Sequence, residues 1–115
     1  MTLVLYEPEG PALEFIGHAG AGARGQDPVC AALSMLMYTL IEALPWARVS
    51  SGEGYCRIEA GERCASRSRR EETAAAFRVV LGGLRLLAES EPRHVRLLYR
   101  HVAQSKGGKH ETGID

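Results

Sequence analysis

The chain has 115 residues, of which 45% are apolar and 24% are charged, the composition of an ordinary globular protein. This length fits one domain with a core of its own, which excludes any need for a metal or disulfide to hold the fold together. The 14 Lys and Arg residues balance 14 Asp and Glu residues. No overall charge therefore draws the chain to nucleic acid or to a membrane.

The targeting signals and cysteines of the sequence predict a cytoplasmic protein. Residues 1–7 contain neither the basic stretch nor the long apolar stretch of a secretory signal. The most apolar run, Val29 to Ile41, is too short to cross a bilayer and is typical of a buried helix. The odd number of cysteines (Cys30, Cys56 and Cys64) indicates free thiols in a reducing compartment.

The pattern of apolar and turn residues predicts elements in the order ββαββαβ. Strands are expected at 3–6 and 13–16, a helix at 28–44, strands at 47–51 and 55–60, a second helix after Ser68, and a strand at 95–99. Ser68 begins an S-x-x-E sequence, the pattern of a helix capping box. This order indicates an α+β fold with two layers, a mainly antiparallel sheet and two helices.

The same pattern sets the domain boundaries. Residues 1–103 are expected to form a single domain, and the polar, glycine-rich residues 104–115 a disordered tail. The helix at 28–44 is apolar almost all round, so something besides one sheet must cover it. In the second helix, Gly82 and Gly83 each weaken the helix by about 1 kcal/mol, which close packing would explain.

The loop from His18 to Cys30 carries the predicted chemistry. Cys30 is expected in the first turn of a helix, where the positive end of the helix dipole favours a thiolate over a thiol. His18 could take the thiol proton and deliver it to a leaving amine, while free N–H groups of the helix stabilise an oxyanion. Gly20, Gly22 and Gly25 let the loop fold back and let an extended peptide approach its backbone.

Two polar neighbours have roles that the residues leave open. Asp27 is a good N-cap before Pro28, so it either caps the N–H of Cys30 or orients the imidazole of His18. Ser34 lies one helical turn after Cys30 and by itself is typical of a serine bonded to its own helix. A lone cysteine is more often a small apolar residue than a nucleophile, but the joint placement of thiol, imidazole and cap favours a catalytic pair.

Three other kinds of site fit the sequence less well. The G-x-G-x-x-G pattern of Gly20, Gly22 and Gly25 needs a parallel βαβ unit and a later acidic residue to bind a dinucleotide, and neither is expected here. A zinc site of His18 with the cysteines lacks paired ligand spacing, so no metal or other cofactor is expected. Two arginine runs are typical of solvated surface, with a polyanion site as the alternative; they are Arg63, Arg67, Arg69 and Arg70, and Arg93, Arg96 and Arg100.

Residues 17–34 resemble the signature of the ribosomal-processing cysteine protease family, Prp. The family carries G-H-A, a glycine-rich loop, G-x-D-x-V-C-A and a serine one turn later, which this chain matches from Gly17 to Ser34 with the same spacing from histidine to cysteine. The resemblance extends in the order of elements through the strand at 95–99. One departure is Pro28, where the family usually has a β-branched apolar residue, but the first turn of a helix tolerates proline.

This resemblance implies a function and a site. His18 and Cys30 take the catalytic positions of the family, and Asp27 and Ser34 match its accompanying polar residues. It implies a homodimer, which would cover the apolar helix, and a substrate, the precursor of large-subunit ribosomal protein twenty-seven. The family removes a short N-terminal extension from that precursor after an aromatic residue, with no membrane or nucleic acid required. The alternative is a catalytically idle module that binds the ribosome or its assembly intermediates through the arginine-rich surface.

Overall fold

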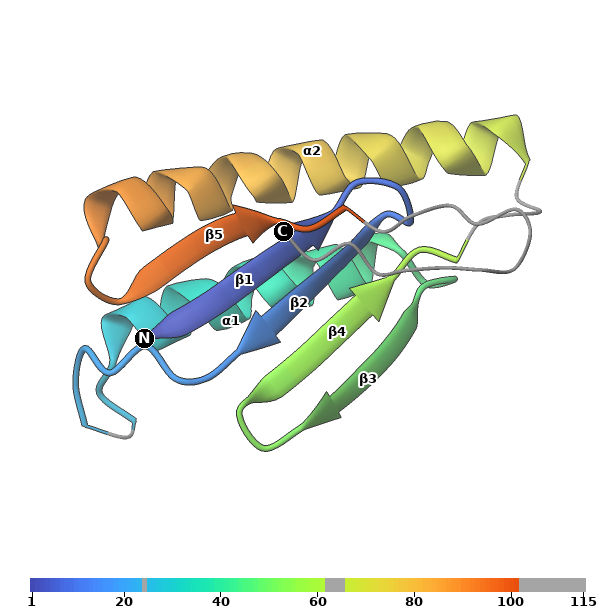
Figure 1. Ribbon diagram of the computed structural model, residues 1–115. Helices are drawn as coiled ribbons and strands as arrows, with labels where there is room; N and C mark the ends of the chain where they lie inside the picture. Colours follow the sequence, from blue (N-terminus) through green and yellow to red (C-terminus); the bar gives the residue numbers. More distant parts are fainter. Residues whose placement is uncertain (24, 62–65, 102–115) are drawn as a thin grey trace.

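In the residues that the structure describes, two hairpins, two helices and a fifth strand form the fold. The computed structural model describes residues 1–23, 25–61 and 66–101. Its elements are β1 (Thr2–Glu7), β2 (Ala12–Ile16), α1 (Pro28–Ala43), β3 (Arg48–Gly52), β4 (Tyr55–Glu59), α2 (Arg67–Ser90) and β5 (Val95–Tyr99) (Figure 1). The predicted order and the α+β class are therefore confirmed. The tail expected at 104–115 lies outside the described residues.

The strands form one mixed sheet in the order β3-β4-β2-β1-β5. The β1–β2, β2–β4 and β3–β4 pairs are antiparallel, whereas β5 lies parallel to β1, with Thr2 opposite Val95. α2 carries the chain from β4 across to the far edge, because a parallel neighbour cannot be reached by a tight turn. Since β4 lies between β2 and β3, the β2–α1–β3 segment is not the adjacent parallel unit that a dinucleotide site needs.

Both helices lie on the same face of the sheet (Figure 1). The core between these layers consists of buried side chains that include Val4, Leu13, Phe15 and Ile58 of the sheet, Leu33 and Leu40 of α1, and Phe77 and Leu84 of α2. At Gly83 a Cβ atom would lie 2.6 Å from the side chain of Leu36, whereas at Gly82 it would meet nothing within 4 Å. Close packing of α2 on α1 thus explains one of the two glycines.

The helix ends differ from the prediction at one point. Ser66, not Ser68, is the N-cap of α2, and its Oγ accepts a hydrogen bond from the N–H of Arg69 at 3.1 Å. The capping box at Ser68 is therefore wrong, because a cap two residues earlier already satisfies the first turn. Within the described ranges, neither this helix nor α1 is long and apolar enough to cross a membrane.

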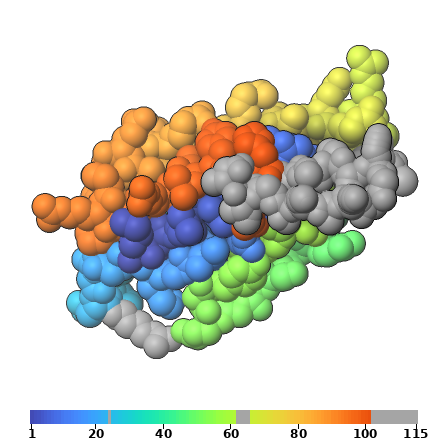
Figure 2. Space-filling view, viewed as in Figure 1, coloured from blue at the N-terminus to red at the C-terminus, as the bar shows by residue number. Residues whose placement is uncertain are grey.

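The sheet face opposite the helices carries a cluster of charged side chains. Glu7 accepts hydrogen bonds from Arg57 at 2.9 and 3.1 Å and from the Nε of Arg100 at 2.8 Å. Glu14 accepts a hydrogen bond from Arg100 at 2.8 Å and another from the hydroxyl of Tyr55. Figure 2 is viewed toward this side of the molecule, where β1, β2 and β4 reach the surface. The cluster links β1, β2 and β4 to Arg100, the residue that follows β5.

Glu7→Gln is expected to lower the free energy of unfolding by about 3 kcal/mol, as for a buried ion pair that loses one partner. Burial opposes ionisation of Glu7, but the hydrogen bonds and charges of Arg57 and Arg100 outweigh it and hold its pKa below the usual 4.5. A lowered pKa makes this stabilisation full above the usual value and removes it as the pH falls through the folded-state value. Urea unfolding at pH 7 and at acid pH measures both effects.

Glu59→Gln is the matched control for this prediction. Glu59 also pairs with Arg57, at 3.0 Å, but its side chain is 33% exposed. We expect its loss to cost less than about 1 kcal/mol, as for other ion pairs near the surface. Two results would contradict this prediction. One is equal destabilisation by Glu7→Gln and Glu59→Gln, and the other is a loss of unfolding free energy in Glu7→Gln that is as large at acid pH as at pH 7.

Candidate active site

The ends of β2 and α1 place His18 and Cys30 at the same end of the sheet. His18 follows β2 after Gly17, and Cys30 is the third residue of α1. The N–H of Gly17 donates to the carbonyl of Gly54 at 2.8 Å, and its own carbonyl accepts from the hydroxyl of Thr2 at 3.2 Å. These bonds to β1 and to the β3–β4 turn fix the point where His18 leaves the sheet.

Two pockets of about 370 Å³ each share His18 and Cys30 in their walls. The first lies along the glycine loop, and its remaining walls are Gly20, Gly22, Gly25, Asp27 and Glu53. The second lies between α1 and the β3–β4 hairpin, with a largely apolar wall that includes Leu33, Met37, Tyr38, Ile41, Val49 and Tyr55. We call the two pockets together the catalytic cleft. Cys30 therefore borders both halves of the catalytic cleft.

The sulfur of Cys30 receives a backbone hydrogen bond. The N–H of Ala19 donates to Cys30 Sγ at 3.3 Å, and the carbonyl of Ala19 lies 3.0 Å from His94 Nδ1. Because a carbonyl only accepts, the hydrogen of this second bond belongs to His94 Nδ1. His94 therefore holds Ala19 in the position from which its N–H reaches the sulfur.

Cys30 differs from Cys56 in its exposure. Both thiols border the catalytic cleft, but Cys30 is half-buried whereas Cys56 on β4 is only 6% exposed. Burial raises the pKa of the Cys56 thiol, which keeps it protonated and unreactive. The third cysteine, Cys64, lies outside the described residues. Of the two thiols that the structure describes, Cys30 is the more accessible to a substrate.

The imidazole of His18 lies beside the β3–β4 turn. Its Nε2 is 3.8 Å from the carboxylate of Glu53, and both side chains are more than two-thirds exposed. Gly54 has a φ of +64°, and a Cβ atom there would lie 3.3 Å from this same nitrogen. Among the described residues no hydrogen bond joins His18 to Cys30. The structure thus places the two side chains in one cleft, with the ring directed to Glu53.

Asp27 caps α1 and ties the glycine loop to it. Its Oδ1 accepts hydrogen bonds from the N–H groups of Val29 at 2.9 Å and Cys30 at 3.0 Å, and its Oδ2 accepts one from Ala21 at 2.9 Å. The bond from the Cys30 N–H, aided by the others, lowers the pKa of Asp27 below its usual value. Within the described ranges no hydrogen bond or ion pair joins Asp27 to His18. The capping alternative is therefore confirmed.

The first turn of α1 does not supply the free donors predicted for an oxyanion. Pro28 has no N–H, Val29 and Cys30 donate to the side chain of Asp27, and Ala31 donates to its carbonyl at 3.0 Å. That expectation is wrong because the cap that starts the helix also occupies its donors.

The glycines of the loop are explained by the shape of the loop itself. Gly20 and Gly25 have φ values of +73° and +82°, which side chains rarely tolerate. A Cβ atom at Gly22 would collide with the carbonyl oxygen of Gln26. All three glycines line the catalytic cleft, and their contact with an extended peptide stays a prediction.

Ser34 lies in the wall of the apolar pocket. In the part of the chain that the structure describes, its hydroxyl makes no hydrogen bond. The back-bonding that is typical of a serine in a helix is therefore not present, although Thr39 shows it, with Oγ1 donating to Met35 O at 2.6 Å. Ser34 is half-buried in the cleft one turn from the thiol.

Three further residues of the site carry little signal in the sequence alone. Ala19 contributes only backbone atoms, and His94 is 75 positions away from it. Glu53 stands between two glycines in the β3–β4 turn, and this Gly-Glu-Gly sequence indicates a turn but not its place beside His18. Over the described ranges, no group of three or more His, Cys, Asp or Glu side chains is placed to hold a metal ion.

Three comparisons relate this chain to known proteins. Residues 9–96 match the family described as cysteine protease Prp. The ribosomal processing protease Prp from S. aureus, crystallised with a covalently linked product peptide, is similar with a TM-score of 0.75 at 20% identity, covering 87% of this chain and 100% of that one. A protein from Streptococcus mutans, SMU.848, has a TM-score of 0.65 at 27% identity and covers 87% and 92%. No curated protein matches.

A second structure of the S. aureus protease, with a substrate peptide, has a TM-score of 0.65 at 18% identity and covers 86% of this chain and 97% of that one. These solved structures share the fold, and the family match includes the whole segment from His18 to Ser34. That match spans well over half of the chain. The chain belongs to the cysteine protease Prp family.

Proposed function

We propose that this protein is an endopeptidase that removes the N-terminal extension of large-subunit ribosomal protein twenty-seven in the cytoplasm. The observation that carries the proposal is the catalytic cleft, in which Cys30 and His18 line both pockets. The S. aureus structures hold a product peptide and a substrate peptide, which supports a peptide as the ligand.

The reaction needs one movement of His18. The imidazole turns from Glu53 toward Cys30 and takes the thiol proton, and the thiolate attacks the carbonyl carbon of the scissile bond. A C–S bond forms, the carbonyl electrons move to oxygen, and the C–N bond then breaks as His18 gives its proton to the leaving amine. Water, deprotonated by His18, attacks the thioester, and the released thiolate takes the proton back.

The oxyanion of this reaction needs a donor, which we assign to the backbone of Gly20. The neighbouring N–H groups of Ala19 and Ala21 donate to Cys30 Sγ and to Asp27. Within the described residues the N–H of Gly20 has no such partner, and Gly20 lines the cleft beside Cys30. A fixed backbone donor of this kind stabilises a tetrahedral intermediate without reorganisation.

The apolar pocket suits the aromatic residue that precedes the cut. Leu33, Met37 and Ile41 of α1 form one side of it, and Val49 and Tyr55 of the β3–β4 hairpin form the other. An aromatic ring in such a pocket buries a large apolar area, which gives the substrate most of its binding energy. Ser34 in the same wall offers a hydroxyl to the peptide backbone.

A peptide that spans the junction of the extension tests this function. We expect the protein to cut it once, after the aromatic residue, with two product masses in the mass spectrum. A second peptide with alanine in place of that aromatic residue is expected to stay intact. An uncut junction peptide, or equal cleavage of both peptides, would refute the proposed substrate.

The exposed side of α1 supports a homodimer. Met35 is 64% exposed and Tyr38 is 60% exposed, and they lie on the same helix as buried Leu33 and Leu40. Large apolar side chains that share one surface mark an interface. Sedimentation equilibrium is expected to give twice the mass of one chain, and the mass of one chain for Tyr38→Glu. A monomeric parent protein would contradict this.

Asp27→Asn is expected to lower kcat/KM by about tenfold, because small displacements of catalytic groups are costly. Asparagine caps helices as well as aspartate, so the bonds from Val29 and Cys30 can be kept. The side-chain NH₂ of asparagine then faces the N–H of Ala21, and because both groups are donors the hydrogen bond between them is lost. The loop beside Cys30 is then no longer tied to the helix. Peptide cleavage together with urea unfolding measures the two effects separately.

Asp27→Ala is the comparison for this variant. It loses the cap as well and is expected to cost about 1 kcal/mol of stability, whereas Asp27→Asn stays close to the parent. If Asp27→Asn cleaves as fast as the parent protein, the bond to Ala21 has no part in the reaction.

A further inference from the structure

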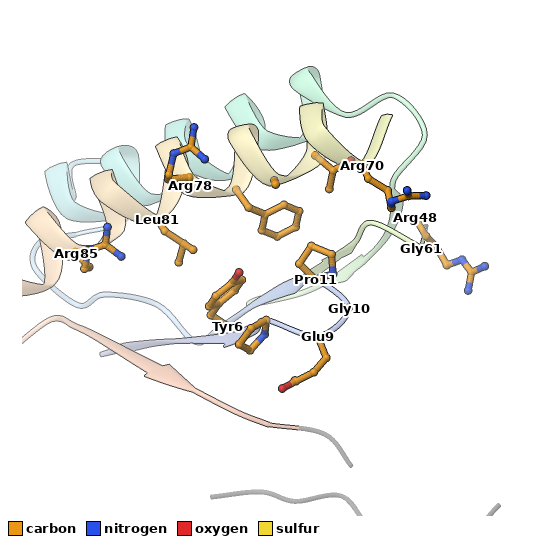
Figure 3. A pocket seen from close by; sticks show the side chains of 14 residues that line it. Tyr6, Glu9, Gly10, Pro11, Arg48, Gly61, Arg70, Arg78, Leu81 and Arg85 are labelled. Atoms are coloured by element: carbon orange, nitrogen blue, oxygen red, sulfur yellow. The ribbon is translucent and has the colours of Figure 1, made fainter. Parts of the chain in front are cut away.

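A wide pocket of about 1090 Å³ lies between α2 and the turn that joins β1 to β2 (Figure 3). Arg70, Arg78 and Arg85 follow one another along α2 on one side, and Tyr6, Glu9 and Pro11 stand on the other. Arg48, at the start of β3, lines the end of the pocket near Gly61. We call this pocket the arginine groove.

The arginine groove is separate from the catalytic cleft. The two have no lining residue in common. Pro11 comes just before β2 and His18 comes just after it, so the strand sets them at opposite ends of the sheet. At about 3.3 Å per residue, the separation is on the order of 20 Å. A ligand in the groove leaves the thiol accessible.

The groove carries a local excess of positive charge in a chain whose total charge is zero. Of the described residues that line it, four are arginines and one, Glu9, is a carboxylate, which lies 3.0 Å from His101 Nδ1. In the described part of the chain, neither Arg78 nor Arg85 pairs with a carboxylate. Arg48 lies 3.8 Å from Glu59, with a side chain that is 78% exposed. The groove therefore suits a ligand with several negative charges.

The groove also contains an aromatic ring in a fixed position. Tyr6 packs edge-on against Tyr99, with ring centroids 5.3 Å apart, and lies 6.2 Å from the ring of Phe77. Burial raises the pKa of Tyr6, so its hydroxyl stays protonated and can donate. An aromatic ring beside a row of cations is the combination with which proteins hold single-stranded nucleic acid, the ring stacking on a base.

We propose that the arginine groove binds the phosphate backbone of a single-stranded RNA. Guanidinium groups hold phosphates through paired hydrogen bonds, and Arg78 and Arg85 are about 10 Å apart along the helix, enough for separate phosphates. A purely acidic peptide would use the arginines but not the ring of Tyr6. The choice of RNA rests on the proposed function, because the proposed substrate is a protein that assembles on RNA.

The test measures binding of a fluorescein-labelled 12-nucleotide oligouridylate by anisotropy, using the Cys30→Ala protein so that no cleavage is involved. We expect binding to weaken as salt rises. The double variant Arg78→Glu with Arg85→Glu is expected to bind at least tenfold more weakly. Its salt slope should fall by about 1.4, since each phosphate contact with a single strand contributes about 0.7.

Arg93→Glu with Arg96→Glu is the matched control. It changes the net charge by the same amount, but both residues are exposed and neither lines the groove. We expect its affinity to stay within twofold of the parent. Equal losses in the two double variants would overturn the site, because overall charge alone would then explain binding.

Two further results would overturn the inference: no salt-dependent binding by the parent, or tighter binding of a glutamate-rich peptide than of RNA.

The double variant Arg78→Gln with Arg85→Gln replaces the glutamate variant if the charge reversal disturbs folding. It is also expected to weaken RNA binding. The failure of this inference is distinct from that of the proposed function. The groove variants, made with Cys30 intact, are expected to cut the short junction peptide at the parental rate whether or not the parent binds RNA.

Discussion

Cys30→Ala is expected to lower the kcat/KM for the junction peptide by at least about 10³-fold, because the nucleophile that attacks the scissile carbonyl and forms the thioester is lost. The side chain is only half-buried and receives one weak hydrogen bond, from the N–H of Ala19. Its removal therefore leaves the fold in place. Steady-state cleavage, with circular dichroism to confirm folding, measures the effect.

Cys56→Ala provides the contrast to this variant. Cys56 is packed in the core on β4 and does its work there as a small apolar side chain. We expect its loss to cost about 1 kcal/mol of stability. Because Cys56 also borders the apolar pocket, cleavage per folded molecule is expected to change by only a few-fold, far less than in Cys30→Ala. A folded Cys30→Ala protein that still cuts the peptide, or a folded Cys56→Ala protein that does not, would show that Cys30 is not the nucleophile.

His18→Ala is expected to lower kcat by about 10²- to 10⁴-fold, the range that general acid–base catalysis supplies. His18 is exposed and its nearest charged partner is Glu53 at 3.8 Å, so little stability is lost with it. The same peptide assay measures this, with circular dichroism to confirm that the variant is folded.

His101→Ala is the control for this second prediction. Its side chain is also mostly exposed and also lies near a glutamate, Glu9, at 3.0 Å. It stands outside the catalytic cleft, so its loss should leave kcat unchanged. If both histidine variants kept the parental rate, the base would have to be another group.

The features that were predictable from the sequence are local ones. Asp27 followed by Pro28 marks the start of α1, and the structure shows that cap with both of its hydrogen bonds. The two hairpins follow from turn residues a few positions apart. The choice between Ser66 and Ser68 was not predictable, because both can cap a helix and the rest of the fold decides which one does.

The features that were missed depend on three-dimensional contacts, some between distant segments and some within one helical turn. His94 reaches Ala19 because β5 pairs with β1, and a sequence pattern does not specify that parallel pairing. The donors expected for the oxyanion were lost to Asp27 through geometry within a single turn. The glycine loop and the cysteine were found from their spacing, but the position of the imidazole was not.

The arginines show the same limit. The two arginine runs of the sequence were the candidate polyanion site. In the structure, however, Arg69 stacks over Trp46 at 4.7 Å and Arg100 is paired with Glu7 and Glu14. Arg63 lies outside the described residues. Arg78 and Arg85 belong to neither run, and they share the arginine groove because they are two helical turns apart.

Labelling with a peptide chloromethyl ketone that ends in an aromatic residue tests the central claim most directly. The inhibitor places a carbon electrophile where the scissile carbonyl would lie, and a thioether records which sulfur attacks it. We expect one adduct per chain, on Cys30, with activity lost in proportion and labelling slowed at least tenfold in His18→Ala. An adduct on Cys56 or Cys64 instead, or full activity after Cys30 is labelled, would contradict the assignment of Cys30 as the nucleophile.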